Sequence, residues 1–143
     1  MSHTRSYILP AVALVLAAGC ARGLGLAAVS GRVMLGGKAL SNVQVEFWPE
    51  NGAPRSTGMT DAEGRFTLVT DGDPRAGAVV GPHRVVLHDL AIYGEMGFRP
   101  REDTNIREKP ARFSFRYADA LQTPLRFTVE AGGSEFEIPV EKK

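Results

Sequence analysis

The sequence predicts an all-β fold: an antiparallel Greek-key β-sandwich of about seven strands, preceded by a signal peptide. Two observations lead to this prediction. From residue 29 onward, apolar and polar residues alternate with a period of two in short runs, as half-buried strands require. Glycine, proline and aspartate separate these runs, and no run beyond residue 20 has the period of a helix.

The start of the chain has the layout of an export signal. Arg5 precedes an apolar run over residues 8–18, and small residues then lead to Cys20. The run of about eleven residues is shorter than the roughly 20 that a membrane-spanning helix needs. We therefore expect residues 1–19 to be a signal peptide.

The Ala-Ala-Gly sequence directly before Cys20 makes this segment resemble a bacterial lipoprotein signal. The resemblance implies cleavage before Cys20 and attachment of lipid, such as palmitate, to that residue. An ordinary cleaved signal and an uncleaved anchor are the alternatives. Residues 20–28 are small and glycine-containing, so we expect a lipidated tether there. The expected location is the cell envelope, on the non-cytoplasmic side of either the inner or the outer membrane.

Composition limits what the rest of the chain can be. Residues 29–143 are enough for one domain that buries its own core without a metal ion. Cys20 is the single cysteine, so no disulfide can form within the chain. The 17 lysines and arginines balance 16 aspartates and glutamates, so no basic face for nucleic acid is expected.

The first half of the domain reads as three strands with tight turns. Residues 29–35 alternate, Gly36-Gly37 suits a turn with positive φ, and residues 43–48 alternate again, which predicts a hairpin. A short third strand is expected over residues 56–60. Residues 61–64, Asp-Ala-Glu-Gly, form a turn because aspartate bonds its own backbone and glycine takes the left-handed conformation.

The second half adds four strands and one long irregular segment. Alternation predicts strands at residues 65–68, 83–88, 125–129 and 136–140. Residues 89–123 are expected to form a long surface loop, with a short strand or docked segment at the Phe-Ser-Phe-Arg-Tyr stretch. The apolar side of each alternation predicts the core: Val33, Val45, Phe47, Phe66, Leu68, Val85, Leu87, Phe127, Val129, Phe136 and Ile138.

Three segments, residues 29–49, 60–68 and 81–87, together resemble the carboxypeptidase regulatory-like domain. They match its Gly-x-Val opening, its Thr-Asp-x-x-Gly-x-Phe turn and strand, and its later Val-rich strand. The resemblance covers nearly all of residues 29–141 and implies a transthyretin-like (prealbumin-like) β-sandwich. Ala39 stands where the family usually has proline, and His83 where it has an inward aromatic residue. Such domains are non-catalytic, so the resemblance implies no cofactor.

The acidic and histidine residues are interpreted as structural. Asp61, Glu63, Asp71 and Asp73 lack calcium-loop spacing, since the twelfth position from Asp61 is Gly72, and we interpret them as turn residues. His83 and His88 lie on opposite faces of one predicted strand, so they are not expected to share a metal ion. His83 is expected in the core or at its boundary, and His88 in solvent at the strand end.

Neither a catalytic group nor a cofactor site is predicted. No Gly-x-Ser-x-Gly elbow occurs, and Cys20 is expected to carry lipid. We therefore expect a non-enzymatic envelope protein with a structural or protein-interaction role, its 89–123 loop and sheet edges contacting a partner. The alternative is a small-ligand or glycan-binding module at the cell surface. Its ligand would contact an aromatic platform of Trp48, which is predicted to face outward, with Tyr93 and Phe98.

Overall fold

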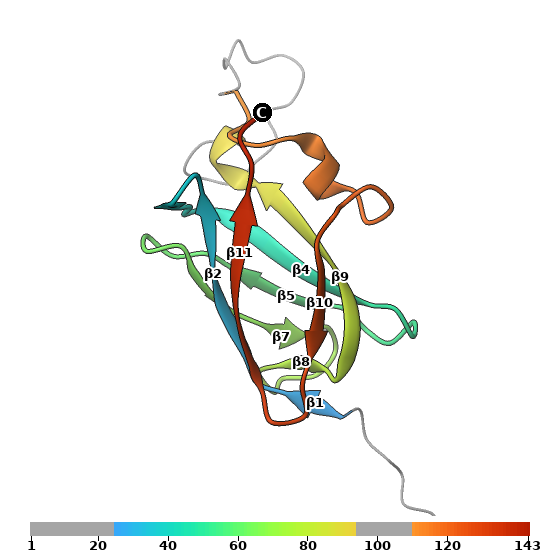
Figure 1. The fold of residues 1–143 in the computed structure, drawn as a ribbon. Coiled ribbons are helices and arrows are strands. Elements are labelled where there is room, and N and C mark those ends of the chain that lie inside the picture. The colour runs from blue at the N-terminus through green and yellow to red at the C-terminus, as the bar shows by residue number, and fades with distance from the viewer. Residues whose placement is uncertain (1–24, 94–109) are drawn as a thin grey trace, which may run out of the picture.

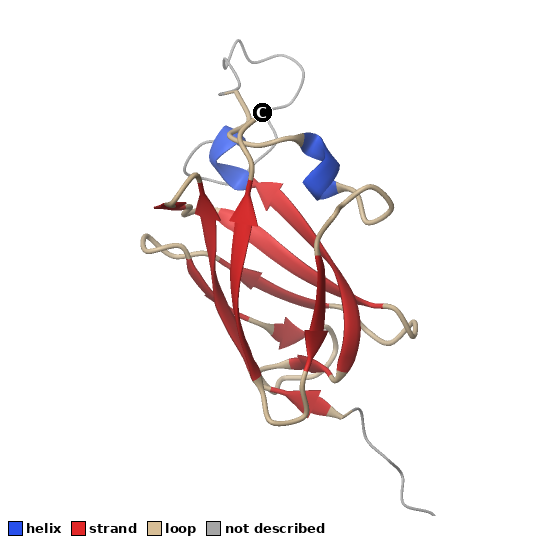
Figure 2. Ribbon diagram, in the orientation of Figure 1, coloured by secondary structure: helices blue, strands red, loops and turns tan. Residues whose placement is uncertain are grey.

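The chain folds as a β-sandwich (Figures 1 and 2), as a computed structural model that describes residues 25–93 and 110–143 shows. The larger sheet has the order β10 (Arg126–Val129), β9 (Gly81–Asp89), β4 (Val43–Pro49), β5 (Ser56–Met59) and β7 (Val69–Thr70). In the smaller sheet, β2 (Val29–Leu35) lies between β11 (Ser134–Val140) and the short strands β3 (Lys38–Ala39) and β6 (Arg65–Thr67). A third pairing joins β1 (Leu26–Ala27) to β8 (Ala78–Val79).

The predicted all-β sandwich is therefore confirmed. Of the strands in the described residues, β1, β3, β7 and β8 have two residues each. The seven longer strands match the predicted number of about seven. The other elements in these ranges are two short 3-10 helices, η1 (Leu90–Tyr93) and η2 (Phe115–Ala118).

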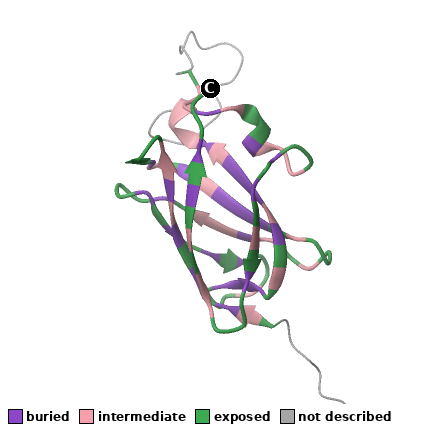
Figure 3. Ribbon diagram, viewed as in Figure 1, coloured by how far each residue is buried: buried purple, intermediate pink, exposed green. Residues whose placement is uncertain are grey.

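The core lies between the two sheets and includes all the residues predicted for it except Phe127 and Phe136 (Figure 3). It also contains residues that were not predicted: Ala27, Val29, Leu40, Val43, Ala78, Phe113, Tyr117, Leu125 and Val140. Phe127 and Phe136 are half-buried and pack against the core, with ring centroids 4.9 Å apart. Phe47 is fully buried and packs against both rings and against Phe66 and His83. Burying a side chain of this size contributes about 1.5–3 kcal/mol.

One predicted hairpin is wrong. Gly36 and Gly37 do form a tight turn with positive φ, but it connects β2 to β3, not to β4. After β3, the buried Leu40 and the left-handed Asn42 take the chain into the other sheet, where β4 pairs with β5 and β9. The glycine pair predicted the turn correctly; it carries no information about which strand comes back.

The antiparallel pattern has one exception in the described ranges. β11 runs parallel to β2, with Ile138 opposite Val33. The cause is the connection after β10, where Gly133 takes a φ of 96° and the chain crosses from the larger sheet to the smaller one. β10 and β11 therefore belong to different sheets and do not form a hairpin.

The domain begins before the predicted boundary. Leu26 and Ala27, expected within the tether of residues 20–28, pair with Val79 and Ala78, and Ala27 is buried. The tether prediction is therefore wrong for these two residues, because pairing with β8 and the burial of Ala27 make them part of the domain. Residues 1–24, with Cys20, lie outside the described residues.

The predicted surface loop over residues 89–123 is partly a packed element. Phe113 and Tyr117 are buried against the core and pack edge to face, with ring centroids 5.9 Å apart. Thr123 is also buried, and its hydroxyl donates to the carbonyl of Val85 at 2.7 Å. The segment from Phe113 onward is thus docked, one of the two forms expected for this aromatic stretch. The rest of the expected loop, residues 94–109, lies outside the described residues.

Candidate functional site

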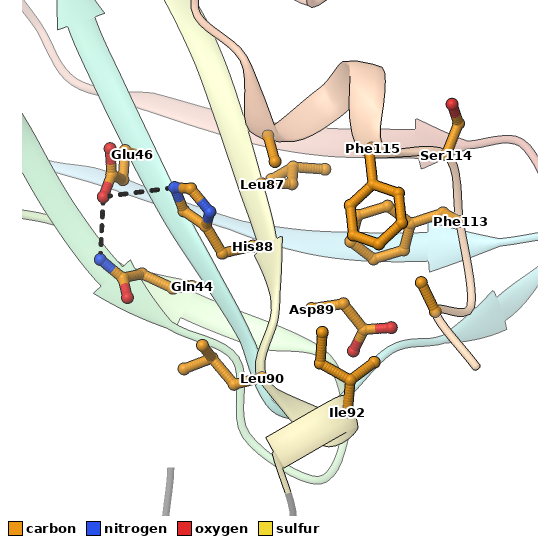
Figure 4. Close-up of a pocket in the computed structure, with 12 residues that line it drawn as sticks. Gln44, Glu46, Leu87, His88, Asp89, Leu90, Ile92, Phe113, Ser114 and Phe115 are labelled. Atoms are coloured by element: carbon orange, nitrogen blue, oxygen red, sulfur yellow. Dashed lines mark hydrogen bonds and ion pairs between the residues drawn. The ribbon is translucent and has the colours of Figure 1, made fainter. Parts of the chain in front are cut away.

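A pocket of about 400 Å³ lies where β4 and β9 meet the docked segment before and within η2 (Figure 4). Polar side chains from the two strands form one end, and apolar side chains from η1 and the docked segment form the other. The lining residues are Gln44, Glu46, Leu87, His88, Asp89, Leu90, Ile92, Ala111, Phe113, Ser114, Phe115 and Ala118.

Strand alternation and register assemble the polar end. Gln44, Glu46 and Trp48 occupy alternate positions of β4, so they share its outer face, opposite the buried Val45 and Phe47. Antiparallel pairing puts His88 of β9 directly across from Gln44. Residues far apart in the sequence therefore meet on one face.

Glu46 is the centre of this polar group. Its Oε1 accepts a hydrogen bond from Gln44 Nε2 at 2.9 Å and lies 3.7 Å from His88 Nε2. Its Oε2 accepts from Trp48 Nε1 at 2.8 Å and from an Arg55 Nη1 at 3.4 Å. The Glu46 side chain is only 5% exposed, although it projects from the outer face of the sheet.

Arg55 connects this group to a second carboxylate. Its Nε donates to Asp71 at 2.9 Å, and its guanidinium lies 5.3 Å from the centre of the Trp48 ring. The hydrogen bond to Asp71, followed by the charge of Glu46, raises the pKa of Arg55 above its ordinary value. The arginine is therefore a permanent cation shared between two carboxylates.

The apolar end comes from two segments next to the end of β9. Leu90 and Ile92 belong to η1, while Phe113 and Phe115 belong to the docked segment. Phe113 is buried, whereas Phe115 is 63% exposed. Figure 4 shows the Phe113 and Phe115 rings on the opposite side from Glu46, Gln44 and His88.

An ion pair between Asp89 and Arg112 fixes this arrangement. The carboxylate of Asp89 accepts from the Nε and Nη2 of Arg112, the latter at 2.7 Å, and also from the backbone N–H groups of Arg112 and Ala91. Arg112 also donates to the carbonyl of Ser41 at 2.7 Å. The ion pair thus holds the start of η1 and the start of the docked segment at one point.

The predicted aromatic platform is only partly within the described structure. Trp48 faces outward as predicted and is 39% exposed, but it does not line the pocket; its indole N–H holds Glu46. Tyr93 is the last residue of η1, which supplies Leu90 and Ile92 to the pocket. Phe98 lies outside the described residues.

The interpretation of the acidic residues as turn formers is confirmed for Asp61 and Asp73. The Oδ1 of Asp61 accepts from the backbone N–H groups of Glu63 and Arg65, at 3.0 and 2.8 Å. Asp73 accepts from Arg75, through both backbone and side chain, and this lowers the pKa of Asp73 to about 2. In the described part of the chain, no three histidine, cysteine or acidic residues form a group able to hold a metal ion.

The two histidines lie on opposite faces of β9, as predicted. His83 is buried in the core, where its Nδ1 lies 2.9 Å from the carbonyl of Gly81 and its Nε2 has no partner. Burial lowers the pKa of His83 below its ordinary value of 6.5. His88 was expected in solvent, but its side chain is only 37% exposed because it lies against Glu46.

Sequence reasoning missed the group around Glu46. The signal was the run of Gln44, Glu46 and Trp48 at alternate positions, whose spacing is right for three side chains on one face. What the sequence could not supply was the partner strand and its register, which bring His88 and Arg55 to the same place.

Comparison with known proteins gave no match: no family model, curated protein or solved structure is similar enough to this chain to be reported. The helices in the described residues are short 3-10 turns, and none of them is long or apolar enough to cross a membrane.

Proposed function

We propose that this chain is a non-enzymatic, lipid-anchored protein of the bacterial cell envelope whose domain contacts a partner protein. The proposal draws on the lipoprotein-like sequence around Cys20 and on the resemblance of residues 29–141 to the carboxypeptidase regulatory-like domain. Several acyl chains on Cys20 would hold the domain at the membrane, because each buried CH₂ contributes about 0.8 kcal/mol.

The observation that most favours a contact role is the ion pair of Asp89 and Arg112. It joins the two ends of residues 90–111 at the rim of the sandwich, beside the exposed Phe115. An exposed side chain on a fixed base, such as Phe115, loses less conformational freedom when it binds a partner. This rim is therefore the part of the domain where we place the contact with the partner.

The anchoring part is tested by metabolic labelling with radioactive palmitate. We expect wild-type protein to incorporate label and Cys20→Ala to incorporate none. Equal labelling of the two proteins would refute the anchor. Mass spectrometry of the N-terminal peptide distinguishes an acylated Cys20 from an ordinary cleaved signal.

The contact part is tested by photo-crosslinking in the native envelope. A photoreactive residue in place of Phe115 is expected to capture one defined protein, because this side chain is exposed at the rim. The matched control carries the same residue in place of Val80, which is 37% exposed next to β8. If both positions capture the same proteins in the same amounts, the rim has no special role.

A second candidate function is binding of a small ligand at the cell surface, and the pocket beside Glu46 favours it. Its volume of about 400 Å³ lies within the roughly 300–1,000 Å³ typical of small-molecule sites. Polar groups at one end and apolar ones at the other match how such sites orient a ligand. A thermal-shift screen against small metabolites and glycans tests this function directly.

A further inference from the structure

We propose that the pocket beside Glu46 binds a small organic cation with an apolar body, of the arylalkylammonium class. The ammonium group would lie at Glu46 Oε1, and the apolar body would lie against Ile92 and Phe115. This inference rests on the second candidate function, ligand binding, and is independent of the lipid anchor and of any partner protein.

The charges at the polar end favour a cation. Two carboxylates line the pocket, and one of them, Asp89, is neutralised by Arg112 at 2.7 Å. In the described residues, Arg55 is the only lysine or arginine within 4.0 Å of Glu46, and it lies closer to Asp71. Glu46 thus shares its arginine with another acid, and His88, 3.7 Å from Glu46 Oε1, adds a positive charge only if it is protonated. With His88 neutral, a negative charge remains next to the pocket.

The environment of Glu46 strengthens this attraction. The carboxylate is nearly excluded from water, and its hydrogen bonds from Gln44 and Trp48 hold it in one orientation. Coulomb attraction grows as the local dielectric constant falls, so a charge held in this way attracts a cation more strongly than an exposed glutamate does. Two further arginines, Arg84 and Arg126, lie 3.8 Å from Glu50, which is beyond Trp48 along the chain.

The opposite end selects for an apolar body. Leu90, Ile92 and Phe115 supply aliphatic and aromatic surface, and Figure 4 shows Ile92 and Phe115 on the opposite side from Gln44 and His88. A simple metal cation or a short polar amine would leave this surface in contact with water. A ligand with a phenyl ring and a short alkylammonium chain would cover it while reaching Glu46.

The test compares three probes of nearly equal size: 2-phenylethylammonium, 2-phenylethanol and 3-phenylpropanoate. Binding to the purified full-length chain is followed by the fluorescence of Trp48, the single tryptophan, whose indole N–H contacts Glu46. Calorimetry provides an independent measurement. We expect the ammonium probe to bind at least about tenfold more tightly than the alcohol, and the carboxylate most weakly.

Two variants assign the effect to the pocket. Glu46→Gln removes the charge with little change in shape, and should weaken the ammonium probe about tenfold while the alcohol is unaffected. Its control is Glu137→Gln, an exposed glutamate of β11 on the other sheet, which should change neither probe. Ala118→Phe leaves Glu46 intact and adds a ring to the pocket lining, so it should weaken both probes even if Glu46→Gln does not fold.

Equal affinity for the ammonium and the alcohol would overturn the role of charge. No binding of any probe to wild-type protein at millimolar concentration, or full binding to Ala118→Phe, would overturn the site itself. Neither result affects the labelling or crosslinking experiments, so a failure of this inference is distinguishable from a failure of the proposed envelope function.

Discussion

Arg112→Met removes the cation from an ion pair that is largely buried. The Asp89 side chain is 4% exposed and that of Arg112 27%, and the guanidinium makes three hydrogen bonds to the carboxylate. Removing one partner of a fully buried pair costs about 3–5 kcal/mol, because the other charge is left without compensation. Arg112 is partly exposed, and Asp89 keeps two backbone donors, so we expect a loss of about 2–4 kcal/mol.

The loss is measured by urea unfolding followed by Trp48 fluorescence. A loss of this size corresponds to a fall in Tm of roughly 10–20 °C for a domain of this length. The matched control is Arg75→Met, which breaks a pair of similar geometry, 2.6 Å from Asp73, on the open surface. Its midpoint should hardly change, because solvent screens exposed pairs.

A double variant separates two contributions to this loss: the missing Asp89–Arg112 attraction and the buried Asp89 carboxylate left without a partner. Asp89→Asn together with Arg112→Met leaves no unpaired carboxylate, so it should be more stable than Arg112→Met alone. If Arg112→Met and Arg75→Met shift the urea midpoint equally, burial does not increase the contribution of the Asp89–Arg112 pair to stability, and the reasoning is wrong.

Two further predictions concern the core. Because burial lowers the pKa of His83 below 6.5, the unfolded chain takes up a proton more readily than the folded one. The contribution of this residue to stability is therefore complete above pH 6.5 and declines as the pH falls below it. The urea midpoint of the wild-type protein should fall between pH 7.5 and pH 5, and that of His83→Phe should fall less. If the midpoints of the two proteins change in parallel with pH, the prediction is wrong. Gly31→Ala places a Cβ against the backbone carbonyl oxygen of Phe136 and 2.8 Å from the Phe66 ring, and should cost about 1–3 kcal/mol or more. Gly132→Ala, with open space around it, should be nearly neutral in the same assay.

The sequence was informative about strands because their signal is local. Alternation in residues 43–48 correctly placed Val45 and Phe47 inside and Trp48 outside, since each side chain's face depends only on its position along the strand. The partner of a strand is not local information. This is why the turn at Gly36 was predicted while its hairpin was assigned to the wrong strand, and why the parallel pairing of β11 was missed.

The candidate site was beyond sequence reasoning for a related reason. His88 reaches Gln44 through the register of β9 on β4, and Arg55 reaches Glu46 from the start of β5. Phe113 and Phe115 enter from the aromatic stretch that was expected to be a short strand or a docked segment, but its docking place was not predictable. The sequence shows each of these residues, but not that they lie together, because their grouping depends on how β9, β5 and the docked segment pack around β4.

Glu46 itself shows where the alternation rule stops. The rule assigns polar residues to the solvent side, and Glu46 does project from the outer face, yet it is almost fully buried by its own neighbours. Removing a carboxylate from water costs free energy of folding. A buried ion pair often does not recover that cost, since apolar residues of similar size stabilise a protein as well or better. A residue such as threonine, which β5 uses at Thr57 directly opposite, would cover the sheet at lower cost. If the carboxylate serves the binding that we propose, Glu46→Gln and Glu46→Thr should both keep the fold, and both should lose the preference for an ammonium probe. Loss of the fold in both variants would instead assign Glu46 to folding.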